Sequence, residues 1–588
     1  MQSVEKIQKW LKDCKKDVFL INNTDEFLSE YVAPYAERLN WISNFTGSAG
    51  RAIIEKNKAY IFIDGRYTNQ ANLEVDTNYF EIKHLKDYWS HLIKYKEKNK
   101  IISLDPLLHS IEEVKKIKDI FKDSLASLIF LDINPVDSCW KDQPLKPNSN
   151  VFLHEIKYSG ETALVKIKRI QDQLRLNFID LYLLSSLDSI AWLLNIRGND
   201  NENTPLVCCY AIVPRRGKIE LFINNKNFKI PPKEINNIVN INLIETIDNY
   251  IKAINKFLFF GMDEKLTSYH FKNLCIAKSI TTKNFENPCL YPKAIKNKTE
   301  LRGAKKANLR DGVSFTKYLY WLKNKMKINA TDEIKAADYL LNLRKKNELY
   351  FSPSFDTISA FGHHAALPHY RVTKESNLSF KNNSIYLVDS GAQYRDGTTD
   401  ITRTIIIGNP TEEQKDRFTR VLKGHIAIAE AIFPVNTRGS QLDPLARKSL
   451  QEINCDYDHG TGHGIGSFLN VHEGPQRIAK SLADNDGLMK EGMIISNEPG
   501  YYKEGEYGIR IENLLIIRFK KFKNLDLLRF ETISFSPIDR DLIDISLLNK
   551  NEIKWLNNYH KKVYKILSPY LNSNEKKWLH SVTNLIKV

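Results

Sequence analysis

The sequence from Ile385 to Ile407 reads IYLVDSGAQYRDGTTDITRTIII, with two β-rich runs on either side of a Tyr-Arg-Asp-Gly turn. This pattern predicts a β-hairpin. Asp389 lies in the first run and Asp400 in the second, at similar distances from the turn, so their side chains can point to one face. Two carboxylates that face each other in a sheet repel unless a positive charge lies between them. A divalent cation is the simplest explanation, and two surface carboxylates beside a turn are the alternative.

The next segment with chemistry to explain is HGTGHGIGSFLNVHEG (His459–Gly474), which places three histidines and five glycines in sixteen residues. Glycine lets the backbone approach a site closely. A lone histidine would most often be structural, whereas three in a glycine-rich loop favour a site lined by imidazoles. The glycine spacing does not match the dinucleotide-binding pattern G-x-G-x-x-G, so we do not expect a nucleotide.

Further carboxylates follow in the same half of the chain. Glu498 lies in IISNEPGYY, between an apolar strand-like run and a Pro-Gly turn. Arg510 and Glu512 lie two apart in YGIRIENLLII, so a continuous strand would place them on the same face. A carboxylate in a buried strand needs a cation. A buried Arg510–Glu512 ion pair and a metal site both satisfy that need.

These segments together supply four carboxylates and one imidazole. Oxygen-rich ligation with a single histidine favours Mn²⁺ over Zn²⁺. Four carboxylates are enough to bridge two ions about 3.5–4 Å apart. Such a pair lowers the pKa of a bound water and stabilises an oxyanion on an attacked carbonyl group.

The N-terminal half contains a faint internal repeat. LINNTDEF (Leu20–Phe27) is similar to LLSSLDSI (Leu183–Ile190), and WISNFTG (Trp41–Gly47) is similar to WLLNIRG (Trp192–Gly198). Each copy predicts a strand that ends at a turn-forming Asp, followed by an aromatic helix and a glycine turn. Two tandem α/β domains of similar architecture are therefore expected.

The expected domain boundaries follow from this repeat and from a change in pattern near residue 293. We place one α/β domain at 1–155, a second at 156–292, and an α+β domain at 293–588. The last domain is predicted to begin with a long amphipathic helix over 296–325 and a second helix near Thr331–Asn347. A chain of 588 residues exceeds the about 250–300 residues of one hydrophobic core, which agrees with several domains.

Composition limits the partners and the compartment. The formal charge of +16 invites a nucleic-acid interpretation, but the lysines are spread along the chain and their local clusters are short. We therefore expect neither a nucleic-acid nor a membrane partner. The seven cysteines form no CxxC motif, which favours a reducing compartment, and the charged N-terminus does not match a secretory signal. The sequence thus predicts a cytoplasmic protein.

The motifs together resemble the pita-bread metallopeptidases, which include aminopeptidase P, prolidase, methionine aminopeptidase and creatinase. The resemblance is greatest to the three-domain cytosolic aminopeptidase P (Xaa-Pro aminopeptidase) group and extends over essentially the whole chain. It rests on VDSGAQYRDGTTDITRT, HGTGHGIGSFLNVHEGP, NEPGYY and GIRIEN in the third domain, on SEYVAP, GSAG and DGRY in the first, on SIAWLLNIRG in the second, and on the C-terminal WLNNYH. It implies two creatinase-type α/β domains followed by a pita-bread domain.

The resemblance also implies roles for individual residues. The five metal ligands would be Asp389, Asp400, His463, Glu498 and Glu512. Glu498 would also exchange a proton with a hydroxide that bridges the two ions. The substrate-binding residues would be His369, His459, His472 and Arg510. Of these, His369 would also stabilise the transition state, His472 would also take part in catalysis, and Arg510 would lie beside the last ligand. The segment FGHHAALPHY departs from the family pattern, and its extra histidines, His363 and His364, receive no role.

The implied reaction is hydrolysis of the bond that joins an N-terminal residue to proline, through the metal-bridging hydroxide. His369 or His472 would help to stabilise the oxyanion, and Glu498 would carry a proton to the leaving nitrogen. The resemblance further implies a homodimer formed through the C-terminal domain. Two alternatives remain: a prolidase-type dipeptidase of the same fold, and a non-catalytic pita-bread binding module.

Overall fold

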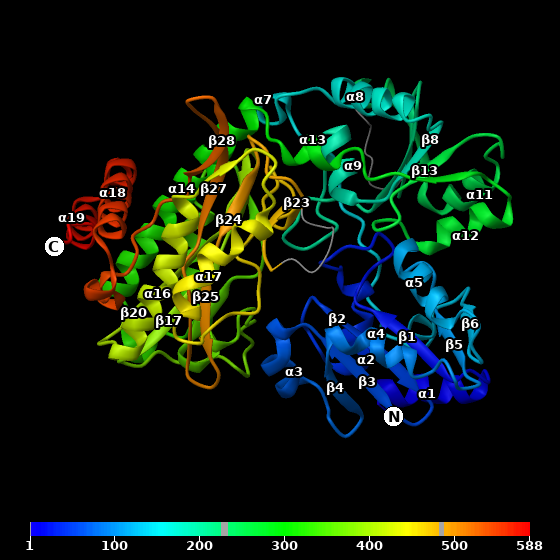
Figure 1. Cartoon of the computed structure of the whole chain (residues 1–588), viewed down its shortest axis with the longest axis horizontal. Coiled ribbons are helices and arrows are strands. Elements are labelled where there is room, and N and C mark those ends of the chain that lie inside the picture. Colours follow the sequence, from blue (N-terminus) through cyan, green and yellow to red (C-terminus); the bar gives the residue numbers. More distant parts are fainter. Residues whose placement is uncertain (1, 225–232, 481–486, 588) are drawn as a thin grey trace. The chain divides into compact units, whose positions relative to one another are not determined.

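The computed structural model describes residues 2–224, 233–480 and 487–587 of the chain. Contacts divide the chain into two compact units, which are described separately below. The first contains Met1–Leu153 and Glu161–Leu290, and the second contains His154–Gly160 and Tyr291–Val588. In Figure 1 the first unit runs from blue to green, and the second continues to red at the C-terminus. The predicted three-domain division at 155 and 292 stays a prediction.

The first unit begins with a six-stranded mixed sheet in the order β4-β3-β2-β1-β5-β6. Strands β1, β2 and β3 pair antiparallel, and the outer pairs are parallel. The strands are β1 (Val18–Asn22), β2 (Gly50–Glu55), β3 (Ala59–Ile63), β4 (Phe80–His84), β5 (Ile101–Leu104) and β6 (Ser127–Phe130). The first helix of this unit is α1 (Ser3–Asp13), which buries Val4, Ile7 and Leu11 at helical spacing against the core.

A second sheet in the same unit repeats this topology strand for strand. Its order is β12-β11-β10-β8-β13-β14, again with an antiparallel centre and parallel outer pairs. The strands are β8 (Leu181–Leu184), β10 (Cys209–Pro214), β11 (Ile219–Ile223), β12 (Val239–Leu243), β13 (Phe260–Met262) and β14 (Thr282–Asn284). The internal repeat in the sequence therefore reflects two α/β domains of one architecture (Figure 1).

Helices connect the strands of both sheets. They are α2 (Arg38–Ser43), α3 (Thr68–Glu74), α4 (Tyr88–Ile93), α5 (Ile111–Phe121), α6 (Pro135–Cys139), α8 (Ala163–Leu176), α9 (Leu187–Leu194), α11 (Ile247–Lys252) and α12 (Tyr269–Ala277). The aromatic helices that the repeat predicted are α2 and α9, and both end at an asparagine in the left-handed conformation, Asn44 and Asn195. A left-handed residue closes a helix and turns the chain, as expected for a repeated supersecondary unit.

The second unit is built on long helices and antiparallel sheets. Helix α14 (Lys298–Asn324) begins at Asn297 and α16 (Glu412–Ala429) begins at Thr411, each with a capping box. This unit also contains the short α7 (Ile156–Ser159) and the helices α15 (Glu333–Arg344), α17 (Asp443–Gln451), α18 (Lys550–Leu567) and α19 (Ser573–Val582). The two helices predicted at the start of the third domain are thus present as α14 and α15.

The largest sheet of this unit has the order β21-β28-β27-β24-β22-β23, and smaller sheets are β16-β17-β20, β15-β18-β19 and β25-β26. The strands are β15 (Tyr350–Pro353), β16 (Ile358–Phe361), β17 (Ser384–Ser390), β18 (Ala392–Tyr394), β19 (Gly397–Thr398), β20 (Ile401–Ile407), β21 (Ile432–Pro434), β22 (Gly462–Gly464), β23 (Glu473–Ile478), β24 (Ile494–Asn497), β25 (Gly500–Lys503), β26 (Tyr507–Arg510), β27 (Asn513–Phe522) and β28 (Leu525–Thr532). The segments with conspicuous chemistry in the sequence all lie on or beside these strands.

Close backbone approach joins α14 to the turn between β18 and β19. A Cβ atom at Gly303 would lie 2.1 Å from the carbonyl oxygen of Asp396, a distance that no other residue type can accept. The hairpin that carries Asp389 and Asp400 is therefore seated directly on the long helix.

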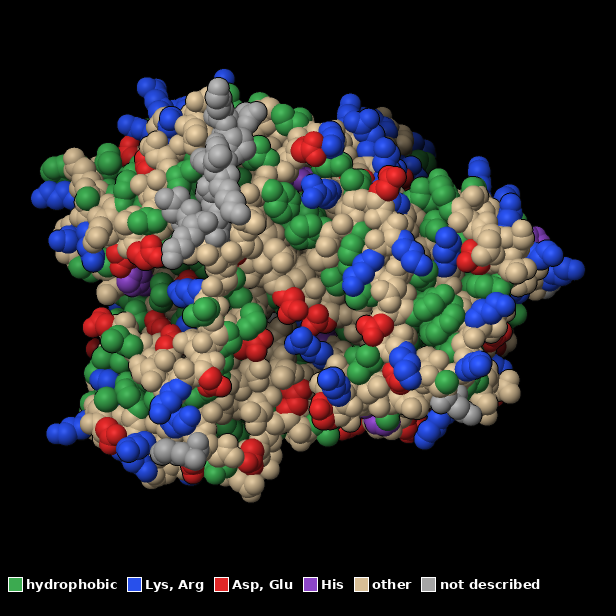
Figure 2. All heavy atoms as spheres, turned by 180° about the vertical axis from the view of Figure 1, so that it is seen from behind, with side chains coloured by type: hydrophobic (Ala, Val, Ile, Leu, Met, Phe, Trp, Pro, Cys, Tyr) green, Lys and Arg blue, Asp and Glu red, His purple; other side chains and the backbone are tan. Residues whose placement is uncertain are grey.

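The surface agrees with the even spread of lysines along the sequence. Figure 2 shows basic side chains scattered over the face in view and interleaved with acidic ones. Among the residues that the structure describes, no helix has both the length and the apolar character to cross a membrane. The seven cysteines are all free thiols.

Candidate metal centre

Asp389 and Asp400 lie at the ends of two paired strands. Asp389 is on β17, opposite Thr402 of β20, and is 8% exposed. Asp400 immediately precedes β20 and is 4% exposed, so its predicted place within the second strand is off by one residue. Between them the chain makes the smaller β18–β19 hairpin rather than one simple turn.

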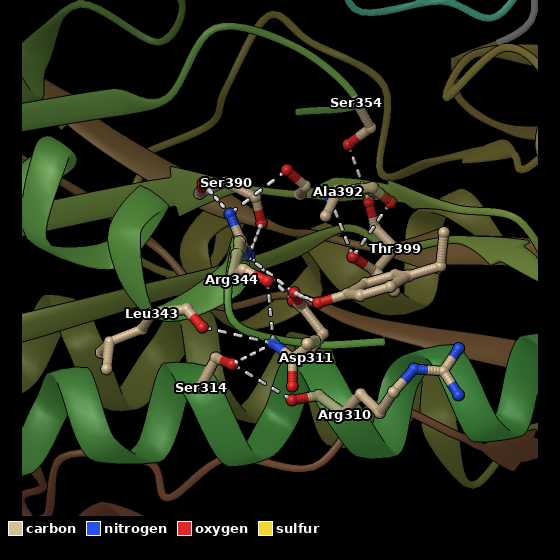
Figure 3. A network of polar contacts seen from close by, with 12 residues as sticks. Arg310, Asp311, Ser314, Leu343, Arg344, Ser354, Ser390, Ala392 and Thr399 are labelled. Atoms are coloured by element: carbon tan, nitrogen blue, oxygen red, sulfur yellow. Dashed lines mark hydrogen bonds and ion pairs between the residues drawn. The ribbon is translucent and has the colours of Figure 1, made fainter. Parts of the chain in front are cut away.

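A buried ion pair fixes the backbone that follows Asp389. The guanidinium of Arg344 donates to both carboxylate oxygens of Asp311, at 2.7 and 2.8 Å. The same guanidinium donates to the carbonyl oxygen of Ser390 at 3.1 Å, and Figure 3 shows it between the two partners. Helices α14 and α15 thus hold the strand end at the first candidate ligand.

The backbone before Asp400 is held in a similar way. The Thr399 amide donates to the carbonyl oxygen of Ala392, and the Ala392 amide donates to the Thr399 hydroxyl at 3.0 Å (Figure 3). The Ser354 hydroxyl donates to the Thr399 carbonyl oxygen at 2.9 Å. Both carboxylates therefore extend from backbone that has little freedom.

His463 brings an imidazole to these carboxylates from β22. Its Nδ1 contacts the carbonyl oxygen of Gly464 at 3.1 Å, so Nδ1 carries the proton. Its Nε2 then faces Asp400 at 3.6 Å and Glu498 at 3.2 Å. Burial lowers the pKa of His463, but the two carboxylates outweigh burial and raise the pKa to about 9.

Glu498 follows β24 and shares its Oε1 with two neighbours. The Ser496 hydroxyl donates to this oxygen at 3.1 Å, and the His463 ring lies on the same oxygen. Burial opposes ionisation of Glu498. The hydrogen bond and charge of His463 outweigh that cost and hold the pKa of Glu498 below its usual value.

Glu512 completes the group, although the local structure differs from the prediction. The predicted continuous strand with Arg510 and Glu512 on one face is wrong, because Arg510 ends β26 and Glu512 lies in the break before β27. The two side chains do not pair with each other, although both contact the Thr402 hydroxyl. Glu512 is 1% exposed and accepts a hydrogen bond from the Thr402 hydroxyl at 2.9 Å, whereas Arg510 binds Asp389.

The candidate ligand atoms converge from distant stretches of the chain. Asp400, His463 and Glu512 each place one such atom within 4.8 Å of the others. Three buried carboxylate oxygens accept no hydrogen bond: Oδ1 of Asp389, Oδ1 of Asp400 and Oε1 of Glu512. Orphaned buried carboxylate oxygens are costly unless a cation meets them. The residues present therefore fit bound metal ions.

Electrostatics in the site agree with this fit. Burial and then the neighbouring carboxylates raise the pKa values of Asp400 and Glu512 well above their usual range. The pKa of Asp389 is also raised, first by burial, although the positive charge of Arg510 opposes the shift. Several carboxyl groups that resist ionisation in one place are typical of a site completed by a cation.

Arg510 links Asp389 to the surrounding loops. It donates to Oδ2 of Asp389 at 2.7 Å and to the carbonyl oxygen of Pro368 at 3.1 Å. It also donates to the Tyr502 hydroxyl at 2.5 Å. Since His369 follows Pro368, the arginine connects a candidate ligand to the loop of a candidate catalytic histidine.

The two candidate substrate-binding histidines lie beside the ligands. His459 contacts the carbonyl oxygen of Gly460 through Nδ1 and the Tyr502 hydroxyl through Nε2, both at 2.8 Å. Burial lowers the pKa of His459 to about 4, so the ring is neutral and accepts from Tyr502. The ring of His472 meets that of His463 edge-on, with 4.3 Å between ring centroids.

Comparison with known proteins places this site in a family. The description "Metallopeptidase family M24" matches residues 302–518, and "C-terminal region of peptidase_M24" matches 526–586. "Creatinase/Prolidase N-terminal domain" matches twice, at 4–135 and 142–300. A protein of Laccaria bicolor called probable Xaa-Pro aminopeptidase P is 37% identical over 97% of this chain and 91% of its own length. The chain belongs to metallopeptidase family M24.

Two further similarities cover this M24 chain from end to end. A probable Xaa-Pro aminopeptidase P of Coccidioides posadasii is 36% identical over 97% of both chains. The crystal structure of X-prolyl aminopeptidase from Caenorhabditis elegans, described as a cytosolic enzyme with a di-nuclear active site, superposes with a TM-score of 0.91. It is 32% identical and covers 97% of this chain and 95% of its own.

These findings decide several of the sequence-based predictions. The family and the enzyme class, a metallo-aminopeptidase, are confirmed. So is the fold, with two creatinase-type α/β domains before a pita-bread domain. A centre with two divalent metals is supported by the family and by the di-nuclear relative. The roles of individual residues stay predictions.

Three residues of the M24 site were missed in the sequence. Tyr502 joins His459 to Arg510, Thr402 binds Glu512, and Ser496 binds both the His463 amide and Glu498. Each lies within four residues of a candidate ligand, in NEPGYY, in DITRT or before Glu498. Hydroxyl side chains next to ligand positions were the available signal.

Proposed function

We propose that this M24 enzyme is a dinuclear Xaa-Pro aminopeptidase, which removes the N-terminal residue from peptides with proline in the second position. The single observation that carries a metal-dependent reaction is the cluster of orphaned carboxylate oxygens beside His463. Support for the substrate class comes from the relatives, which carry this activity in their names and match over the full length of the chain.

The proposed metal site consists of Asp389, Asp400, His463, Glu498 and Glu512. When bound, a pair of divalent ions supplies a hydroxide nucleophile near neutral pH and stabilises negative charge on the attacked carbonyl oxygen. The oxygen-rich donor set favours Mn²⁺. Thr402, Ser496 and Gly464 orient Glu512, Glu498 and His463 respectively, as second partners commonly do for metal ligands.

The chain's own residues have separate tasks in the proposed reaction. Glu498 stays ionised, since His463 lowers its pKa, and can receive a proton and carry it to the leaving proline nitrogen. His369 or His472 donates to the developing oxyanion. His459 is neutral and held by Tyr502, so it forms a fixed wall for the bound peptide. Arg510 holds Asp389 in place and does not itself need to touch the substrate.

The chemistry of the bond before proline explains why a dedicated enzyme cleaves it. The bond to proline is a tertiary amide without an N–H, so peptidases that need a backbone donor there cannot engage it.

The test is release of the first residue from Xaa-Pro-Xaa peptides, lost with a chelator and restored by Mn²⁺, with Xaa-Ala-Xaa as the matched control. A preference for Xaa-Pro dipeptides would instead favour the prolidase-type alternative. Salt-sensitive nucleic-acid binding without bound metal and without cleavage would favour the binding-module alternative.

The compartment and assembly are part of the same proposal. We infer a cytoplasmic enzyme from the free thiols and from the cytosolic relative of Caenorhabditis elegans. We also propose a homodimer formed through the C-terminal domain, with no nucleic-acid or membrane partner. Sedimentation of the purified chain tests the dimer, and a monomer at micromolar concentration would contradict it.

A further inference from the structure

The loop that carries His369 is anchored on one buried carboxylate. Glu333, the first residue of α15, is fully buried. It accepts the Phe361 amide at 2.7 Å and the Leu378 amide at 2.9 Å, so both ends of the loop 361–378 attach to one side chain. A carboxylate that closes a loop at its two ends fixes its position, because neither end can move without leaving a buried N–H unpaired.

His364 makes a third attachment to the same carboxylate. Its Nδ1 lies 2.9 Å from Oε1 of Glu333, and since a carboxylate in this network only accepts, Nδ1 carries the proton. The Tyr370 hydroxyl donates to the other oxygen at 3.1 Å. The rings of His364 and Tyr370 stack, with 4.3 Å between centroids and 26° between planes. His364 therefore fixes the residue that follows His369.

The opposite side of the loop is held from β26. Arg510 donates to the carbonyl oxygen of Pro368, the residue before His369. Gly508 meets the loop so closely that a Cβ atom there would lie 1.7 Å from the carbonyl oxygen of Ala365. His369 thus lies between two neighbours that are fixed independently, one by the metal-site arginine and one by Glu333 and His364.

His364 and its neighbour His363 are both unusual in the sequence, but their surroundings differ. The segment FGHHAALPHY departs from the family pattern at His363 and His364, and no function accounted for either residue. The structure separates them: His364 is 9% exposed and bound to Glu333. His363 is exposed, and the one contact given for its side chain among the described residues is with the His364 ring. The chain therefore offers a matched pair of neighbouring imidazoles in one loop.

We propose that His364 is a positioning residue for the peptidase reaction, which acts by holding Tyr370 and Glu333 so that His369 stays aimed at the substrate. This inference rests on the proposed function, because it assigns His369 a part in that reaction. His364 does not touch the substrate. Its effect on catalysis must pass through His369.

A double-mutant cycle tests that requirement. We expect His364→Ala to lower kcat/KM about tenfold, mostly through kcat, because small displacements of a catalytic group are costly. In a His369→Ala background the same change should lower kcat/KM less than about twofold, because the group it positions is absent. His363→Ala should leave kcat and KM unchanged. An equal loss in both backgrounds, or an equal loss from His363→Ala, would overturn the inference.

Two further measurements keep the test decisive. His364→Asn retains a donor toward Glu333 and should recover part of the lost rate, and it serves as the main variant if His364→Ala does not fold. Hydrogen exchange of the 361–370 segment should quicken in His364→Ala and not in His363→Ala. Unchanged exchange and unchanged kcat/KM would refute the positioning role. If wild-type protein cleaves no Xaa-Pro peptide, the proposed function fails, and exchange still decides whether His364 fixes the loop.

Discussion

In the second unit, the buried carboxylate of Glu333 and those of Asp400 and Glu512 differ in how their oxygens are satisfied. Glu333 accepts from two backbone amides, a tyrosine hydroxyl and an imidazole, so both of its oxygens have donors. Asp400 and Glu512 are also buried, yet each keeps an oxygen that accepts no hydrogen bond. Burial and then a neighbouring carboxylate raise both pKa values: Asp389 acts on Asp400, and Asp400 acts on Glu512. A carboxylate supplied with donors by its own chain is structural, whereas one left without them is built for a cation.

Asp389 combines both arrangements in one side chain. Its Oδ2 accepts from Arg510, and its Oδ1 has no donor. One oxygen therefore belongs to the protein's own network and the other to the candidate metal site. The contrast between Glu333 and Asp400 can be tested directly, since each predicts a different response to the loss of one charge.

The largest effect is expected from Asp400→Ala. Loss of a proposed ligand that faces His463 should release metal and lower kcat/KM by more than about 1,000-fold, because the proposed nucleophile and the charge stabilisation both depend on the ions. Metal content by mass spectrometry, together with Xaa-Pro-Xaa cleavage, checks this. Chelated wild type regains activity with Mn²⁺ and the variant should not. A variant that keeps two ions and full activity would remove Asp400 from the site.

A smaller effect is expected from Arg510→Lys. Lysine keeps the charge but cannot bind Asp389, Tyr502 and Pro368 together. We expect metal affinity or kcat to fall by about 10–100-fold, as for other partners of metal ligands. Metal titration and steady-state kinetics measure the change. Arg518→Lys, which alters a half-exposed pair with Glu531, is the control and should change neither quantity.

Glu333→Gln and Asp400→Asn should change the stability of the metal-free protein in opposite directions. Glu333→Gln introduces donors where the site needs acceptors and should destabilise the protein by about 2 kcal/mol. Asp400→Asn removes one of several repelling buried carboxylates and should raise the stability of the metal-free protein by about 1 kcal/mol. Thermal unfolding of both variants in chelator provides the comparison. Destabilisation of the metal-free protein by Asp400→Asn would mean that its carboxylate is structural after all.

The sequence was sufficient for the architecture and for much of the site. Spaced apolar residues predicted α14 and α15, and the repeat at Leu20 and Leu183 predicted two domains of similar architecture, which proved to share one strand order. The site residues stood out because their types and neighbours, such as glycines around His463, are unusual in a plain core. Local patterns of this kind depend on spacing along the chain, which a sequence displays directly.

The remaining features depend on contacts between segments that are far apart in the sequence. The strand break between Arg510 and Glu512 was not predicted, because period-two spacing fits a straight strand equally well. The partner of Arg510 proved to be Asp389, 121 residues away, and the partner of His364 is Glu333 on a preceding helix. Such pairings are decided by the packing of sheets and helices, and the residue types alone admit several of them.

The smallest effect concerns the pH dependence of stability without metal. The raised pKa values of Asp400 and Glu512 mean that the folded state keeps protons that the unfolded state has lost, and His463 does the same up to a pKa of about 9. A raised folded pKa contributes stability that is complete below the unfolded pKa and is lost as pH rises through the folded value. Chelated protein should therefore lose stability as pH rises above about 4 through the two carboxyl groups, and between about pH 6.5 and 9 through His463, by at most about 1.4 kcal/mol per pH unit for each retained proton.

The same groups should give the opposite slope when metal is present. The proposed metal ions would bind the deprotonated carboxylates and the neutral imidazole, so their contribution to stability should grow as pH rises through this window. Unfolding midpoints at several pH values, with Mn²⁺ and with chelator, measure both slopes. An Asp400→Asn, Glu512→Gln double variant in chelator is the control, and its curve should be flatter because the two retained carboxyl protons are gone. Parallel curves for wild type with and without metal would show that these carboxylates do not exchange protons for a cation.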